Sequence, residues 1–184
     1  MNFTKSTYRL LGLASTGLAI ALSVNLAANS VTTRDGTVAF ESGISLVDVY
    51  STFNSVRVRQ SRYFFELELP ESIGEPLQKL VIRQRTGGEN IDFKPEKTEA
   101  FLGGESRKAE VEATAVFDEA ESGITIEFAQ PIAPGNKVTV SLKPRSNPDL
   151  GGVYLFGVTA FPEGEKSRGL YLGPGRIQIF DSFR

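Results

Sequence analysis

The sequence contains no histidine, no cysteine and no tryptophan, and its only methionine is Met1. These absences exclude Ser-His-Asp and Cys-His catalytic relays, because both need a histidine. They also exclude disulfide bonds, zinc sites built from histidine and cysteine, and haem held by those side chains. We therefore expect a protein that is not an enzyme and that has no catalytic, cofactor-binding or metal-binding residues.

The first thirty residues have the composition of a secretory signal peptide. They contain no acidic residue, and their two charges, Lys5 and Arg9, precede an apolar stretch at 10–22. A basic start followed by an apolar run and small residues is the pattern of a cleaved export signal. The same run approaches the roughly 20 residues that a membrane-spanning helix needs, so a retained anchor is the alternative.

Small residues at the end of this segment indicate where it would be cut. Ala28 and Ser30 fit the two small positions before a cleavage site, and a cut after Ala28 is the second choice. We therefore predict a signal peptide at 1–30 and a single domain at 31–184. A domain of about 150 residues can bury enough apolar surface to fold without disulfides.

The charge of the sequence argues against binding to nucleic acid. The net charge is −2, and cleavage would remove Lys5 and Arg9, which makes the exported domain more acidic. Proteins bind nucleic acids largely by neutralising phosphates with lysine and arginine. We therefore expect no nucleic-acid partner.

Apolar and polar residues alternate along most of the chain after residue 30, and no long stretch carries a helical stripe. Glycine, proline, asparagine and aspartate interrupt this alternation at short intervals. The pattern predicts an all-β protein, an immunoglobulin-like antiparallel β-sandwich of about eight or nine strands. The clearest strands are expected at 56–59, 63–69, 80–85, 111–117, 124–128, 138–142 and 153–161. A helical turn is expected only at 95–99.

Two of these segments depart from simple alternation. The apolar positions switch parity between 56–59 and 63–69, so a turn or bulge is required near Gln60 and Ser61. The segment 153–161 is apolar on both parities, which is typical of a strand buried on both sides. Its aromatic residues are expected in the core, with a ligand pocket as the alternative. These residues are Tyr154, Phe156 and Phe161.

Arginines cluster on the predicted strands. The strand at 63–69 carries Glu66 and Glu68, and it would face arginines on both sides if it lay between 56–59 and 80–85. Such a ladder of exposed ion pairs would contribute only about 0.2–1 kcal/mol per pair. The alternative is a basic docking surface for an acidic partner or an anionic lipid. Its candidate residues are Arg57, Arg59, Arg62, Arg83 and Arg85.

Two groups of acidic residues have the side chains needed for glycoside hydrolysis or calcium binding. Glu66 and Glu68 share one strand face, and a pair of carboxylates can hydrolyse glycosidic bonds without histidine. Any alternating strand produces this spacing, so the pattern is weak. Asp118, Glu119 and Glu121 could bind calcium, which prefers carboxylate oxygens. Their spacing is not that of a known calcium loop, and an ordinary turn is favoured.

Several segments together resemble a known family. They are 65–70 (FELELP), 74–78 (GEPLQ), 131–135 (PIAPG), 138–140 (VTV) and, as the most specific part, 151–162 (GGVYLFGVTAFP), preceded by Asn147 and Pro148. Over about residues 45–180 the chain resembles a cyanobacterial family known as domain of unknown function 2808. The resemblance implies an exported cyanobacterial protein. It supplies no activity, cofactor or catalytic residue.

These observations favour an exported, non-enzymatic binding or structural module that docks to a protein or surface partner. The expected location is the periplasm or cell envelope, with the thylakoid lumen as the alternative. Peripheral association with a membrane is compatible with the basic residues. Two other functions remain open: a carrier of a sugar or an apolar molecule, and a glycan hydrolase that uses carboxylates alone. Co-purification from the native host would distinguish them.

Overall fold

The computed structural model describes residues 31–32, 36–104 and 109–181. The predicted signal peptide, with Ala28 and Ser30 at its cleavage sites, lies outside the described residues. Within the described part, no helix has the length and apolar character needed to cross a membrane.

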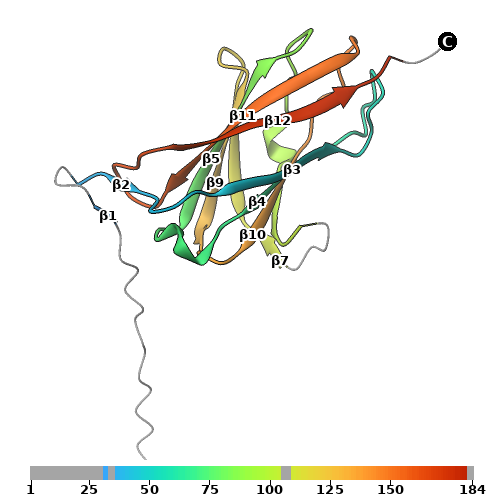
Figure 1. The fold of residues 1–184 in the computed structure, drawn as a ribbon. Helices are drawn as coiled ribbons and strands as arrows, with labels where there is room; N and C mark the ends of the chain where they lie inside the picture. The colour runs from blue at the N-terminus through green and yellow to red at the C-terminus, as the bar shows by residue number, and fades with distance from the viewer. Residues whose placement is uncertain (1–30, 33–35, 105–108, 182–184) are drawn as a thin grey trace, which may run out of the picture.

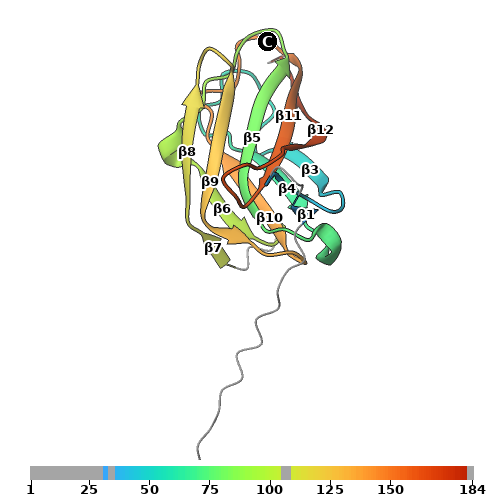
Figure 2. The same cartoon turned by 90° about the vertical axis from the view of Figure 1, so that its left-hand side faces the viewer.

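Two antiparallel sheets of five strands each form a sandwich. The first sheet contains β3 (Ser45–Ser51), β4 (Tyr63–Glu68), β10 (Lys137–Leu142), β6 (Glu99–Leu102) and β7 (Ala109–Val111), in this order. The second contains β12 (Leu170–Ile179), β11 (Gly152–Pro162), β5 (Leu77–Thr86), β9 (Gly123–Ile132) and β8 (Ala113–Asp118). Figure 2 shows the second sheet as a layer in front of the first. A small hairpin of β1 (Val31–Thr32) and β2 (Val38–Ala39) lies at one end (Figure 1).

The immunoglobulin-like sandwich predicted from the alternating pattern is confirmed, with ten strands in its two sheets rather than eight or nine. Part of the difference comes from the segment expected as one strand at 111–117. The chain leaves the first sheet after β7 and enters the second sheet as β8, with only Glu112 between them. One alternating run therefore supplies the edge strands of both sheets. The strand β3 was not predicted.

The core lies between the sheets because alternate residues of each central strand point inward. On β11 the inward residues are Tyr154, Phe156, Val158 and Ala160, and all four are fully buried. The ring of Phe156 meets those of Tyr63, Phe65 and Phe93 edge-on, with centroids 5.9–6.1 Å apart. Edge-to-face packing of this kind stabilises aromatic cores beyond the area that they bury.

The outer face of β11 differs from the prediction. The segment 153–161 was expected to be buried on both sides, but Val153 is exposed and Leu155 and Phe161 are only partly buried. Nothing in the described part of the chain covers the outer face of the second sheet. Its apolar residues are therefore available at the surface, while Tyr154 and Phe156 belong to the core as expected.

The proposed ladder of arginines and glutamates is wrong. Residues 56–60 form turns rather than a strand, which also provides the predicted break before Ser61. The strand β4, which carries Glu66 and Glu68, lies between β3 and β10. Arg83 and Arg85 are on β5, in the other sheet. Valine and arginine alternate at 56–59, but these residues pair with no strand, so the alternation by itself did not predict a strand correctly.

Two local features complete the fold. The helical turn expected at 95–99 is confirmed as a short 3-10 helix at Pro95–Lys97. Gly173, Pro174 and Gly175, residue types that usually form turns, are part of the continuous strand β12, which pairs with β11 along its whole length and has an irregularity opposite Val158.

Candidate functional site

Three segments that are distant in the sequence meet at one end of the sandwich. We call this the loop end and define it as residues 52–62, 143–151 and 180–181. Backbone hydrogen bonds join the segments: Val56 N donates to Phe180 O at 3.1 Å, and Arg57 N donates to Pro148 O at 3.1 Å. The loop end and the β1–β2 hairpin lie at opposite ends of the molecule (Figure 1).

The side chain of Asn147 fixes these loops from inside. It is buried, and its amide nitrogen donates to Phe53 O and to Ser55 O, each at 2.8 Å. Its side-chain oxygen accepts a hydrogen bond from Tyr63 Oη at 3.0 Å. Burial, followed by the effect of Tyr154, raises the pKa of Tyr63 above its usual value, so the hydroxyl stays protonated as a donor.

Lys143 provides a second anchor for the same loop. Its ammonium group donates to Arg59 O and, at 3.0 Å, to Ser61 O. Partial burial lowers the pKa of Lys143, and the nearby cations Arg62 and Lys94 lower it further. The loop at 52–62 is thus held by two side chains from outside its own sequence. A loop held in this way presents a preorganised surface.

Three large apolar side chains project from these fixed loops into solvent. Phe53 is 50% exposed, Leu150 is 54% exposed and Phe180 is 55% exposed. The backbone of Phe180 is bonded directly to the neighbouring loop, since Phe180 N donates to Asn54 O at 2.6 Å. Exposed apolar side chains grouped on one surface are a feature of interaction sites, whereas single ones are common on any protein.

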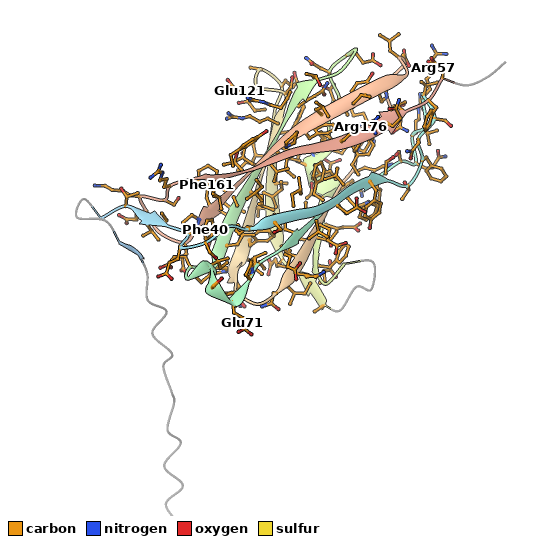
Figure 3. All side chains as sticks on the ribbon, viewed as in Figure 1. Phe40, Arg57, Glu71, Glu121, Phe161 and Arg176 are labelled. Carbon is orange, nitrogen blue, oxygen red and sulfur yellow. The ribbon has the colours of Figure 1, made fainter. Side chains whose placement is uncertain are left out.

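Arginines flank these apolar side chains. Arg57 lies at the tip of its loop and pairs with Asp149, with Nε 3.1 Å from Oδ1 (Figure 3). Its φ of 61° lies in the left-handed region, which is unfavourable for a residue with a side chain. Arg59 is exposed and forms no ion pair with a described residue. Aromatic residues and arginine are the types enriched in protein interfaces.

The other arginines of the predicted docking surface are used differently. Arg62 is engaged within the fold: it pairs with Glu99 at 2.9 Å, donates to Ser141 Oγ at 2.7 Å and donates to Lys97 O at 2.8 Å. Arg83 and Arg85 lie on the outer face of the second sheet. The structure therefore places Arg57, Arg59 and Arg62 together at the loop end and separates them from Arg83 and Arg85.

The acidic candidates have ordinary structural roles. Glu68 approaches Lys137 at 3.9 Å on the neighbouring strand. The carboxylate of Asp118 accepts hydrogen bonds from Ala120 N at 2.9 Å and Glu121 N at 3.2 Å, as in a common turn. Among the described residues, no group of three or more acidic side chains is arranged to hold a metal ion.

Sequence reasoning missed the apolar members of the loop end. Phe53 lies in a polar stretch of turn-forming residues, and a large aromatic side chain in such a stretch was a usable signal. Leu150 follows Asn147 and Pro148, which in the sequence are distinguished only by the resemblance to a family. Phe180 directly follows Ile179 and so breaks the alternation of the last strand, which was a usable signal that its side chain faces outward. Their proximity depends on long-range pairing, which no local pattern reveals.

Comparisons with known proteins identify a family. A family model described as "Protein of unknown function (DUF2808)" matches residues 37–179. No curated protein matches the sequence. Among solved structures, the collagen-binding domain of a Staphylococcus aureus adhesin is 9% identical, with 73% of this chain and 98% of that chain covered and a TM-score of 0.38. The collagen-binding subdomain of Enterococcus faecalis surface protein ACE is 8% identical, with 71% and 92% covered and a TM-score of 0.43.

Proposed function

The chain belongs to the DUF2808 family, and we propose that it is an exported, non-enzymatic binding module that docks to a protein partner through its loop end. The observation that carries the proposal is that Phe53, Leu150 and Phe180 are each half or more exposed on the loop end, whose loops are held by the partly buried hydrogen bonds of Asn147. A partner that buries them gains apolar contact at a small entropic cost.

The chemistry of the surface favours a protein as the partner. Binding energy in protein interfaces is concentrated in a few aromatic and arginine side chains near the centre of the contact. The loop end offers two phenylalanines, with Arg57 and Arg59 beside them. Arg57 is already paired with Asp149, so an acidic group on the partner would compete with or extend that pair. We expect the partner to present an apolar patch with acidic residues at its rim.

Affinity capture tests the proposal directly. The protein is immobilised and exposed to an envelope extract of the cells that make it, alongside the double variant Phe53→Ser, Phe180→Ser. The control is Val116→Ser, because Val116 is 68% exposed on β8 and is not part of the loop end. We expect one partner to be captured by the wild type and the control and lost with the double variant. Equal capture by all three would refute the proposal.

We further propose that the protein acts outside the cytoplasm, in the periplasm or cell envelope of a cyanobacterium, with the thylakoid lumen as the alternative. The support is the basic and then apolar composition of residues 1–30. N-terminal sequencing of the protein from its native host should start at Val31, or at Asn29 after the alternative cut. Protein that still carries residues 1–25 would contradict cleavage.

A further inference from the structure

A hollow lies on the outer face of the second sheet, on a different surface from the loop end. Its volume is about 310 Å³, at the lower end of the range for small-molecule sites. Its floor and walls come from three adjacent strands, β5, β11 and β12. The lining residues are Val81, Arg83, Arg85, Gly157, Thr159, Phe161 and Tyr171.

Gly157 leaves room on β11 for side chains from the two neighbouring strands. In the register of the sheet, Gly157 lies between Arg83 and Pro174, and all three share the outer face. A Cβ atom at Gly157 would lie 3.2 Å from Arg85 Cδ and 3.2 Å from Tyr171 Cε2. The side chains of Arg85 and Tyr171 therefore lean over the glycine from the two neighbouring strands.

The two arginines of the hollow differ in their availability. The side chain of Arg83 passes over Gly123, where an added Cβ atom would lie 2.8 Å from Arg83 Cγ. The guanidinium of Arg83 pairs with Glu121, with Nη1 3.5 Å from Oε2. Arg85 forms no ion pair or side-chain hydrogen bond with a described residue. Arg176, further along the face, donates to Gln178 Oε1 at 2.7 Å (Figure 3). Arg85 is thus the guanidinium that is free to bind an anion at the hollow.

The two aromatic rings also differ. Phe161 packs over Gly169, and the ammonium group of Lys79 lies 4.7 Å from its ring centroid. Such a cation satisfies the ring face that it covers. Tyr171 is 55% exposed and stands beside Arg85. The hollow therefore combines one guanidinium that has no ion pair among the described residues with one open aromatic ring, and Thr159, which lies opposite Tyr171 in the register, adds a hydroxyl.

We propose that this hollow binds a carboxylated sugar unit of an acidic polysaccharide. The planar guanidinium of Arg85 matches a carboxylate with two parallel hydrogen bonds. The ring of Tyr171 offers an apolar surface for the C–H face of a pyranose, and the hydroxyl of Thr159 can donate to or accept from a sugar hydroxyl. The hollow is large enough for one or two sugar rings.

A peptide is a poorer fit to the same place. Peptides that bind sheets usually add a strand at a free edge, where the main chain gives the affinity. Here β11 is paired on both sides, with β12 and β5, so the hollow offers no free main-chain groups at its floor. Recognition at the floor of the hollow therefore depends on side chains, which suits a compact charged ring better than an extended chain.

The test compares three probes by isothermal titration calorimetry with the purified protein. Trigalacturonate carries the carboxylated ring, a neutral galactose trimer carries the ring alone, and triglutamate carries carboxylates without a ring. We expect trigalacturonate to bind and the other two to bind at least about tenfold more weakly, since each lacks one of the two contacts. Absence of trigalacturonate binding, or equal binding of triglutamate, would overturn the proposal.

Matched variants locate the site. Arg85→Gln should weaken trigalacturonate binding by about tenfold or more, because it removes the charge-assisted contact. Arg83→Gln removes the same charge from the same face of β5, but that guanidinium is held by Glu121, so the loss should stay below about threefold. Gly157→Ala should also weaken binding, since the added methyl group crowds Arg85 and Tyr171. Equal losses for the two arginine variants would show that only net charge matters and would overturn the assignment.

The proposal is independent of docking at the loop end. The variants Phe53→Ser and Phe180→Ser should leave trigalacturonate binding unchanged, and Arg85→Gln should leave partner capture unchanged. Each proposal can therefore fail without the other.

Discussion

Tyr63 donates a hydrogen bond to the side chain of Asn147 at 3.0 Å, and both residues are buried. Tyr63 begins β4 in the core, and Asn147 lies in the loop after β10. The bond therefore ties the aromatic core to the loop end. The amide nitrogen of Asn147 also donates to Phe53 O and Ser55 O, so one side chain links a core residue to the loop that carries Phe53.

Asn147→Ala should destabilise the protein by about 2–4 kcal/mol, because it leaves the hydroxyl of Tyr63 and the carbonyl of Ser55 without their partner. The carbonyl of Phe53 loses one donor but keeps the hydroxyls of Ser51 and Ser61. Urea unfolding followed by circular dichroism measures this loss. The matched variant Tyr63→Phe removes only one of the three bonds and should cost about 1–2 kcal/mol. If Asn147→Ala were as stable as the wild type, the loop end would not be held from inside as described.

Arg57→Gly should weaken partner binding while leaving the free energy of unfolding nearly unchanged. The φ of 61° costs a residue with a side chain about 1–2 kcal/mol, which glycine avoids. Glycine also makes the unfolded chain more flexible by about 0.4–1 kcal/mol, so the free energy of unfolding should change by less than about 1 kcal/mol. Partner binding should weaken by about tenfold or more, because an arginine that flanks the apolar side chains is lost.

The control for this prediction is Arg57→Ala, which loses the same guanidinium and keeps the unfavourable backbone conformation. It should bind the partner as weakly as Arg57→Gly and be less stable than that variant. Thermal melts and surface plasmon resonance on the three proteins provide the comparison. Full partner binding by both variants would show that Arg57 does not contribute to docking.

Local patterns predicted the class of fold because alternation of apolar and polar residues is the direct consequence of strand geometry. The same patterns failed where the outcome depends on which strands become neighbours. Arg57 and Arg85 both follow the alternation, yet one lies in a turn and the other on β5. The hollow at Gly157 was also out of reach, since a glycine in an apolar run does not reveal which side chains lean over it.

Phe156→Ala should cost about 3–5 kcal/mol, because the ring is fully buried among three other aromatic rings. Phe161→Ala is the control on the same strand, since Phe161 lies on the outer face and is only partly buried. Its loss should be about 1 kcal/mol. Equal losses for the two variants, measured by urea unfolding, would contradict the assignment of inner and outer faces of β11.

The stability of the protein should fall at alkaline pH. Burial, followed by the charge of Glu89, raises the pKa of Tyr154, and burial raises the pKa of Tyr63. Both exceed the pKa of 10.0 that tyrosine has in an unfolded chain. This stabilising contribution is complete below that pH and is lost as the pH rises through the folded values, because the unfolded state releases its protons first.

Urea unfolding at a series of pH values above neutrality checks this dependence. Tyr63→Phe should be less stable at neutral pH and should lose less stability on going to alkaline pH than the wild type does. A variant with the same alkaline loss as the wild type would show that Tyr63 is not the group responsible.

Hydroxyl-radical footprinting of the protein, alone and bound to its captured partner, tests docking at the loop end most directly. Side chains that become buried in a complex are oxidised more slowly, and the method reports each residue separately. The docking model predicts that oxidation of Phe53, Leu150 and Phe180 slows in the complex, while Val116 on β8 reacts at the same rate in both states. Slower oxidation of Val116 with no change at Phe53 and Phe180 would contradict it and would move the partner to the face of the second sheet.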